Sequence, residues 1–118
     1  MAEKKDLKES KLFTPYKLND KVTLRNRTIR SAAFESMGKD FNPTQKLKDY
    51  HVSVAKGGVG MTTLAYASIN RSGVSFNSQL WLRDEVIEPL KDITDAIHAE
   101  GAAAGIQIGH CGNMTHWS

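Results

Sequence analysis

Three mainly apolar stretches alternate with two amphipathic ones along this sequence of 118 residues. The apolar stretches cover residues 28–34, 59–69 and 102–109, and the second and third contain no charged side chain. Uncharged runs rich in small and β-branched residues are typical of strands covered on both faces, as in parallel sheets. The pattern therefore predicts three buried, parallel strands.

The two amphipathic stretches predict helices. The first helix is expected to begin at Pro43 and Thr44 and to end at Lys56, because Gly57 and Gly58 follow it. Its residues at helical spacing are Leu47, Tyr50, His51 and Val54.

The second helix is expected to carry Pro89 in its first turn and to end before Gly101. Its apolar stripe consists of Leu90, Ile93 and Ile97. The resulting order, strand-helix-strand-helix-strand, implies parallel strands with right-handed crossovers and an α/β fold. A doubly wound sheet and a (β/α) barrel both satisfy this order, and periodicity alone leaves both open.

The region before the first strand has a different character. Leu18, Val22 and Leu24 surround the Asn19-Asp20 pair, which suggests a small hairpin or cap. Residues 1–10 are polar and rich in lysine, so we expect a flexible leader there and a single domain over residues 11–118.

Composition narrows the function classes. A hydrophobic content of 40% supports a real core, and the net charge of +3 owes much to four lysines near the start. Basic residues are not clustered with aromatic ones, so nucleic-acid binding is not expected. The start has no apolar signal region, and no stretch approaches the ~18 apolar residues of a membrane span. With one cysteine, Cys111, an intramolecular disulfide is excluded, and we expect a cytoplasmic protein.

Two motifs invite a ligand interpretation that their spacing does not favour. The glycines of GGVG (57–60) come after a helix and before a strand, whereas phosphate loops need the opposite order. They are predicted to end the helix. His110, Cys111 and His116 match no zinc spacing, so no metal site is expected.

Two reactive side chains, Cys111 and Glu35, can be interpreted either as catalytic or as structural residues. Cys111 could act as a nucleophile only with a base held against it, which the sequence does not show. Glu35 follows the first strand and could serve as an acid or base, but a solvated carboxylate at a strand end is the favoured interpretation.

Gln107 is the most informative polar residue. Its neighbours Ile106 and Ile108 should point to one face of the strand, which leaves the amide on the other face. In a parallel barrel that face is the interior, where an amide suits a flat heterocycle edge that both accepts and donates hydrogen bonds. From the residues alone, a buried glutamine satisfied by backbone or water is the favoured alternative.

Several stretches together resemble the Old Yellow Enzyme-like NADH:flavin oxidoreductases. They occur in the family's order over residues 11–113. They are KLFTP (11–15), LRNR (24–27) with TIRSAAFESM (28–37), GGVGMTTLAYASINRSG (57–73), and LWLRDEVIEPLKDITDAIHAEGAAAGIQIGHCGN (80–113).

The resemblance implies a (β/α)₈ TIM barrel that binds FMN at the carboxyl ends of its strands. It also implies that hydride passes from NADH or NADPH to the flavin and then to an electron-poor C=C bond of a small molecule. The positions that match the family's cofactor contacts are Ser31, Ala32, Ala33, Phe34, Ala67 and Gln107. Among them, Gln107 matches the glutamine that hydrogen-bonds the flavin's pyrimidine edge.

Three features depart from the family pattern. Phe34 lies where many members carry Thr or Cys, and Asn113 lies where many have Arg. Phe34 lies within the run RSAAFE (30–35), which is nearer to the family branch that reads R-S-A-T-x-E. The third departure, after Phe34 and Asn113, is the length of the sequence. A barrel needs eight strands and typically ~250 residues, whereas this sequence predicts about three strands.

The length leads to a further set of expectations. The family's catalytic residues, substrate-anchoring pair and FMN-phosphate loops should lie beyond residue 118, with homo-oligomer formation left open for a full-length enzyme. We expect residues 1–118 alone to bind FMN poorly and not to turn over. A non-catalytic fragment, or a different barrel with a phosphate-type ligand, are the alternatives.

Overall fold

The computed structural model describes residues 10–115, and its centre is a four-stranded parallel sheet. The central strand is β4 (Met61–Ser68). Strands β3 (Ile29–Arg30) and β5 (Leu80–Trp81) pair with the two ends of β4 along one edge. Strand β6 (Ala103–Gly109) pairs with the other edge along its whole length. Most of the predicted leader, and His116, lie outside the described residues.

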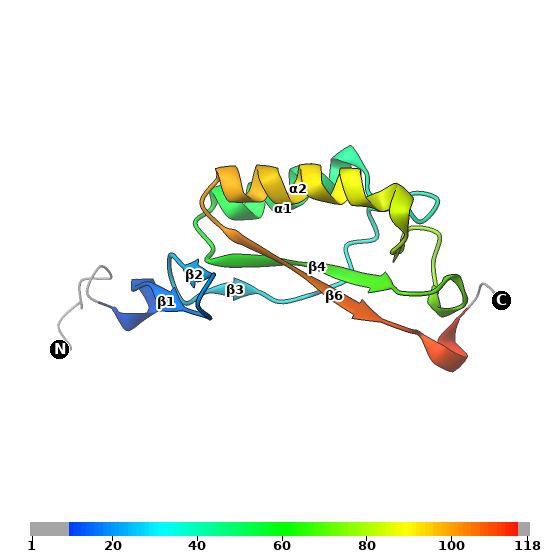
Figure 1. Ribbon diagram of the computed structural model, residues 1–118, viewed down its shortest axis with the longest axis horizontal. Coiled ribbons are helices and arrows are strands. Elements are labelled where there is room, and N and C mark those ends of the chain that lie inside the picture. Colours follow the sequence, from blue (N-terminus) through cyan, green and yellow to red (C-terminus); the bar gives the residue numbers. More distant parts are fainter. Residues whose placement is uncertain (1–9, 116–118) are drawn as a thin grey trace, which may run out of the picture.

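Two helices cover one face of this sheet (Figure 1). Helix α1 (Gln45–Lys56) begins where expected, since the Thr44 hydroxyl accepts the Leu47 amide at 3.2 Å and caps the first turn. Helix α2 (Ile87–Ala99) begins two residues before Pro89. The strand-helix-strand-helix-strand order is therefore confirmed.

A small hairpin precedes the sheet, as the sequence indicates. Its strands β1 (Tyr16–Lys17) and β2 (Thr23–Leu24) are antiparallel. The Asn19 side chain closes the turn by accepting the Lys21 and Val22 amides at 2.8 and 2.9 Å. Short 3-10 helices lie at Lys11–Phe13, Arg71–Gly73, Asp84–Val86 and Gly112–Met114.

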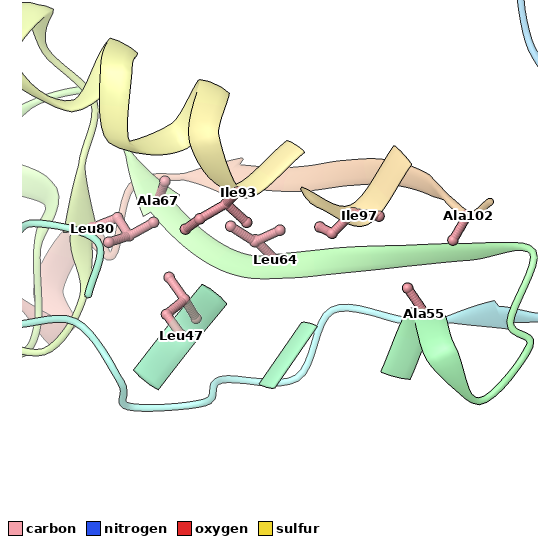
Figure 2. Packing of buried hydrophobic residues seen from close by; sticks show 8 residues of the cluster. All are labelled: Leu47, Ala55, Leu64, Ala67, Leu80, Ile93, Ile97 and Ala102. Atoms are coloured by element: carbon pink, nitrogen blue, oxygen red, sulfur yellow. The ribbon is translucent and has the colours of Figure 1, made fainter. Parts of the chain in front are cut away.

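The hydrophobic core lies between the sheet and the two helices (Figure 2). Both helices, the strands β4 and β5, and the residue before β6 contribute aliphatic side chains with almost no exposed surface. This burial is the main stabilising contribution to the layered arrangement. The cluster consists of Leu47, Ala55, Leu64, Ala67, Leu80, Ile93, Ile97 and Ala102.

The opposite face of the sheet and the outer edge of β6 carry no covering element among residues 10–115. Ile29, on the open face, is 50% exposed, and Ile108, on the edge strand, is 58% exposed. Such apolar surface usually meets another element.

The first predicted strand is much shorter than expected. The sequence predicts one strand over residues 28–34, but pairing with β4 stops at Arg30. The chain leaves the sheet there, and the side chains of Arg30 and Glu35 take the place of backbone hydrogen bonds along β4. Within residues 10–115, no helix has the length and apolarity that crossing a membrane demands.

Candidate functional site

The carboxyl ends of the parallel strands gather several side chains on the helix-free face. Residues 31–36, here called the strand-end segment, follow β3 directly. Phe34 of this segment lies beside Tyr66, near the end of β4, and the 3-10 helix Gly112–Met114 follows the carboxyl end of β6 (Figure 1). Ligand sites of parallel α/β sheets lie at this end of the strands, so these residues form the candidate site.

Arg30 connects the strand-end segment to the rest of the sheet. Its guanidinium donates to the Thr63 carbonyl on β4 at 2.8 Å and to the Ala33 carbonyl at 3.0 Å. The same group lies 5.0 Å from the centre of the Tyr50 ring on α1. One cation therefore joins β4, α1 and the strand-end segment. Above it Ser31 and Ala33 are exposed, while Ala32 is half-buried.

Phe34 belongs to an aromatic cluster. Its ring centre lies 5.0 Å from that of Tyr66 and 5.4 Å from that of Phe76, and its plane is nearly parallel to the Phe76 ring. Burial raises the pKa of the Tyr66 phenol above its usual range, and the charge of Cys111 and a hydrogen bond with it add to the rise. Phe34 is thus held by other rings at a place where the resemblance puts a flavin.

Ala67 lies in the hydrophobic core and not at the candidate site. It has no exposed surface and packs between the sheet and the helices. A ligand cannot touch it in this conformation, so the predicted flavin contact at Ala67 gains no support from the structure. The pairing of β4 with β6 shifts between Leu64 and Ala67, which leaves Ala65 and Tyr66 opposite Gln107. This bulge directs Ala67 into the core.

Gln107 is exposed, which differs from the buried, satisfied amide favoured by the residues alone. Strand alternation places it on the face opposite Ile106, which lines a small pocket with Leu90 of α2. No hydrogen bond to the Gln107 side chain occurs within residues 10–115. Its donor and acceptor are therefore accessible to a ligand on the helix-free face.

The residues after β6 pack against the loop after β4. The Ser72 hydroxyl lies 3.2 Å from His110 Nε2, and the Gly112 amide donates to His110 Nδ1 at 3.0 Å. Cys111 Sγ lies 3.9 Å from the buried amide of Gln79. These contacts surround the thiol with an amide and a phenol rather than with a base. Among the described residues no three ligating side chains are grouped for a metal ion.

Glu35 corrects an expectation. The sequence favours a solvated carboxylate, but the side chain is only 1% exposed. Its Oε2 lies 2.5 Å from His51 Nε2 and accepts the Ala65 amide at 3.2 Å. His51 Nδ1 in turn lies 2.7 Å from the Thr62 hydroxyl. The sequence signal for this chain of contacts is a histidine on the apolar stripe of the first helix.

The LRNR turn (24–27) connects the two helices to the sheet at the amino ends of the strands. Arg25 donates to the carbonyl oxygens of Ala55, Val59 and Glu100 at 2.6, 3.1 and 2.7 Å. The first and third carbonyls lie at the carboxyl ends of α1 and α2, where a cation is favoured. Asn26 donates to the Gly58 carbonyl at 2.6 Å.

The glycines of GGVG also have a structural role, as predicted. Gly57 caps α1, and Gly58 has a φ of 103°, a backbone conformation that favours glycine. A Cβ on Gly60 would lie 2.4 Å from the Asn26 carbonyl oxygen. Close approach of two backbones therefore requires glycine there.

Comparison with known proteins connects this geometry to a family. The family model described as NADH:flavin oxidoreductase / NADH oxidase family matches residues 11–117. The chain is 39% identical over 101 residues to 4,4'-dithiodibutanoate disulfide reductase of Rhodococcus erythropolis, covering 86% of this chain and 25% of that protein. It is 39% identical over 107 residues to NADPH dehydrogenase of Listeria welshimeri, covering 87% of this chain and 31% of the relative.

Solved structures agree on the fold. The Old Yellow Enzyme from Pichia sp. AKU4542 superposes with a TM-score of 0.84 at 20% identity, over 93% of this chain and 29% of its own. The chain thus spans about a quarter to a third of the length of these relatives. Its parallel sheet and two helices correspond to part of their (β/α)₈ barrel. The sequence match and the shared fold together show that the chain belongs to the Old Yellow Enzyme-like NADH:flavin oxidoreductase family.

Proposed function

We propose that this chain forms the first, flavin-contacting part of an FMN-dependent enzyme that uses NADH or NADPH to reduce an activated C=C bond. FMN supplies hydride transfer when it is bound. The protein groups proposed to hold it are the strand-end segment and Gln107. The substrate would be a small enone- or enoate-type molecule, and the location is proposed to be cytoplasmic.

The observation that supports the proposal best is the accessible amide of Gln107. It lies near the carboxyl end of β6, on the face without helices, and opposite Ala65 and Tyr66. A side-chain amide can donate to one atom and accept from another, which matches the alternating carbonyl and N–H groups of a flavin's pyrimidine edge. Donation there favours negative charge on the ring and so raises the reduction potential.

The strand-end segment fits the same ligand. Ser31 and Ala33 offer small, exposed side chains to a flat ring system, and Phe34 sets a rigid aromatic border beside them. Ala67 has no accessible surface, so the proposal assigns the contact at the end of β4 to the adjacent Tyr66. Phe34 replaces a hydroxyl or thiol with an aromatic ring, so its effect on the flavin would come from packing rather than from hydrogen bonding.

The chain's share of its relatives limits which residues can be assigned. Since the matches cover about a quarter to a third of the relatives' lengths, the substrate-anchoring and proton-donating groups are proposed to lie outside this sequence. The relatives' names describe a disulfide reductase and an NADPH dehydrogenase, so the reduced bond can differ within the family. A C=C bond is the proposal for this chain, and a disulfide is the alternative substrate class.

A second candidate is a non-catalytic fragment. The bare edge of β6 and the exposed Ile108 favour this reading for residues 1–118 taken alone, because both surfaces normally meet further strands. Homo-oligomer formation through these surfaces is then an alternative to covering them with more of the same chain.

One experiment separates these readings. The reading frame that contains this sequence is expressed to its natural stop codon, and a second sample contains residues 1–118 only. The proposal expects about one FMN per chain in the first sample, with NADH or NADPH oxidation in the presence of an enone, and little bound flavin in the second. A colourless first sample that oxidises neither nucleotide would refute the proposal, whereas a yellow and active second sample would refute the fragment reading.

A further inference from the structure

Strand β4 loses its backbone partner after Arg30, although its edge continues. The Thr63 carbonyl and the Ala65 amide, two residues apart, point to the edge that β3 has left. Arg30 donates to the carbonyl at 2.8 Å, and Glu35 accepts from the amide at 3.2 Å. Two side chains of the departing segment thus replace two ladder hydrogen bonds, and they do so at both ends of the strand-end segment.

The second of these contacts is buried and extends to helix α1. Glu35 and His51 have 1% and 0% exposed side chains, and the Thr62 hydroxyl completes the chain of contacts. Buried carboxylate and imidazole groups are costly unless each is paired. Their pairing therefore fixes where Glu35 can lie, and with it the backbone of the residues before it.

The backbone geometry supports this. Ser36, which follows Glu35, has a φ of 56°, a conformation that is unfavourable for a residue with a side chain. The chain adopts it immediately after the carboxylate has turned inward to His51. Such a conformation persists where surrounding contacts determine it, and the Glu35 contacts lie directly beside it.

We propose that Glu35 and His51 are positioning residues, which hold the backbone of the strand-end segment in the position that flavin binding requires. This inference rests on the proposed function. Neither side chain reaches solvent, so neither touches the cofactor, and their effect passes through Ser31, Ala33 and Phe34. Thr62 takes part because its hydroxyl orients the His51 imidazole through Nδ1.

Two pairs of variants test this in the full chain. Glu35→Gln keeps the shape but weakens the contact with His51, and Thr62→Val removes the hydroxyl at nearly constant volume. Thr62→Ser keeps the hydroxyl and is the matched control. Ile97→Val loosens the core under α2 without touching the chain of contacts, and it controls for general destabilisation.

Two readouts are combined. Amide hydrogen exchange of residues 31–36 and of Ala65 reports the segment without any flavin. FMN affinity and the visible spectrum of bound FMN report the site. Loss of a buried hydrogen bond should speed exchange by about tenfold or more in Glu35→Gln and Thr62→Val, and weaken FMN binding by about tenfold. Thr62→Ser and Ile97→Val should leave both unchanged in this segment.

The proposal is overturned if exchange in residues 31–36 stays at the wild-type rate in Glu35→Gln. It is equally overturned if exchange rises while FMN affinity and spectrum do not change, since the contacts would then be merely structural. If Glu35→Gln does not fold, the Thr62 pair decides by the same criteria. A wild-type protein without any FMN binding refutes the proposed function instead, and the exchange rates still decide whether Glu35 fixes the segment.

Discussion

The Arg25 guanidinium donates to the Glu100 carbonyl oxygen at 2.7 Å, across 75 positions of the sequence. The same group donates to the Ala55 and Val59 carbonyls, so one side chain joins the ends of both helices to the entry of β4. The arrangement uses the planar, forked donor geometry of arginine, which lysine lacks. The carboxyl ends of both helices are thereby fixed at the end of the sheet opposite to the candidate site.

Arg25→Lys should therefore lower the free energy of unfolding by about 2 to 3 kcal/mol, because at least two charge-assisted hydrogen bonds are lost. Urea denaturation followed by circular dichroism measures this. Arg27→Lys is the matched control, since Arg27 is exposed and its guanidinium contacts the Thr14 hydroxyl and the Tyr16 ring. Equal losses in the two variants would contradict the role given to Arg25.

Gly60→Ala should destabilise the chain by about 1 to 3 kcal/mol, because the new methyl group would lie 2.4 Å from the Asn26 carbonyl oxygen and force backbone movement. Gly109→Ala has no neighbour within 4 Å of its new methyl group and serves as the control. Thermal unfolding of both variants gives the comparison. An unchanged midpoint for Gly60→Ala would show that the strand entry can shift freely.

Gln107→Ala should leave the unfolding free energy within about 0.5 kcal/mol of the wild type, because the side chain is exposed. FMN affinity in the full-length enzyme should fall by about tenfold, and the reduction potential of bound FMN should become more negative. A flavin absorbance titration and a dye-coupled potential measurement test both effects. Unaltered affinity and potential would remove Gln107 from the flavin site.

Tyr66 should ionise at a higher pH than an ordinary tyrosine, since burial raises its pKa and the neighbouring Cys111 adds to the rise. The folded state then binds this proton more tightly than the unfolded state. Stability from Tyr66 is accordingly complete below about pH 10 and is lost as the pH rises through the folded pKa. Absorbance at the tyrosinate band, compared with Tyr66→Phe, should show that the variant loses a tyrosine that ionises above the usual pH range, and an unchanged titration curve would contradict this.

The bare β6 edge predicts self-association of residues 1–118. Ile108→Lys should reduce it, because a charge on an exposed edge opposes strand pairing. Ile87→Lys, at a residue of α2 that is 57% exposed, is the control for added charge. Sedimentation velocity at several concentrations measures the association, and an equal response to both variants would argue against the edge as the contact surface.

The alternating pattern determined much of this fold by itself. Uncharged runs mark β4 and β6 because both faces of a parallel strand are buried, and the stripes with Thr44, Gly57 and Gly101 set the helix bounds within about two residues. The family motifs also identified Gln107 and residues 31–34 as site candidates. These features are local, since each depends on residues close together in the sequence.

The tertiary structure decided what depends on distant partners. Residues 28–34 look like one strand, but Arg30 and Glu35 replace the ladder with side-chain contacts to β4. Glu35 reads as a solvated carboxylate until His51 is seen beside it, 16 positions later. Ala67 reads as a site residue until the β4 bulge directs it into the core. A sequence displays the types of these residues but not the direction in which each side chain points, and that direction is set only when strands and helices pack.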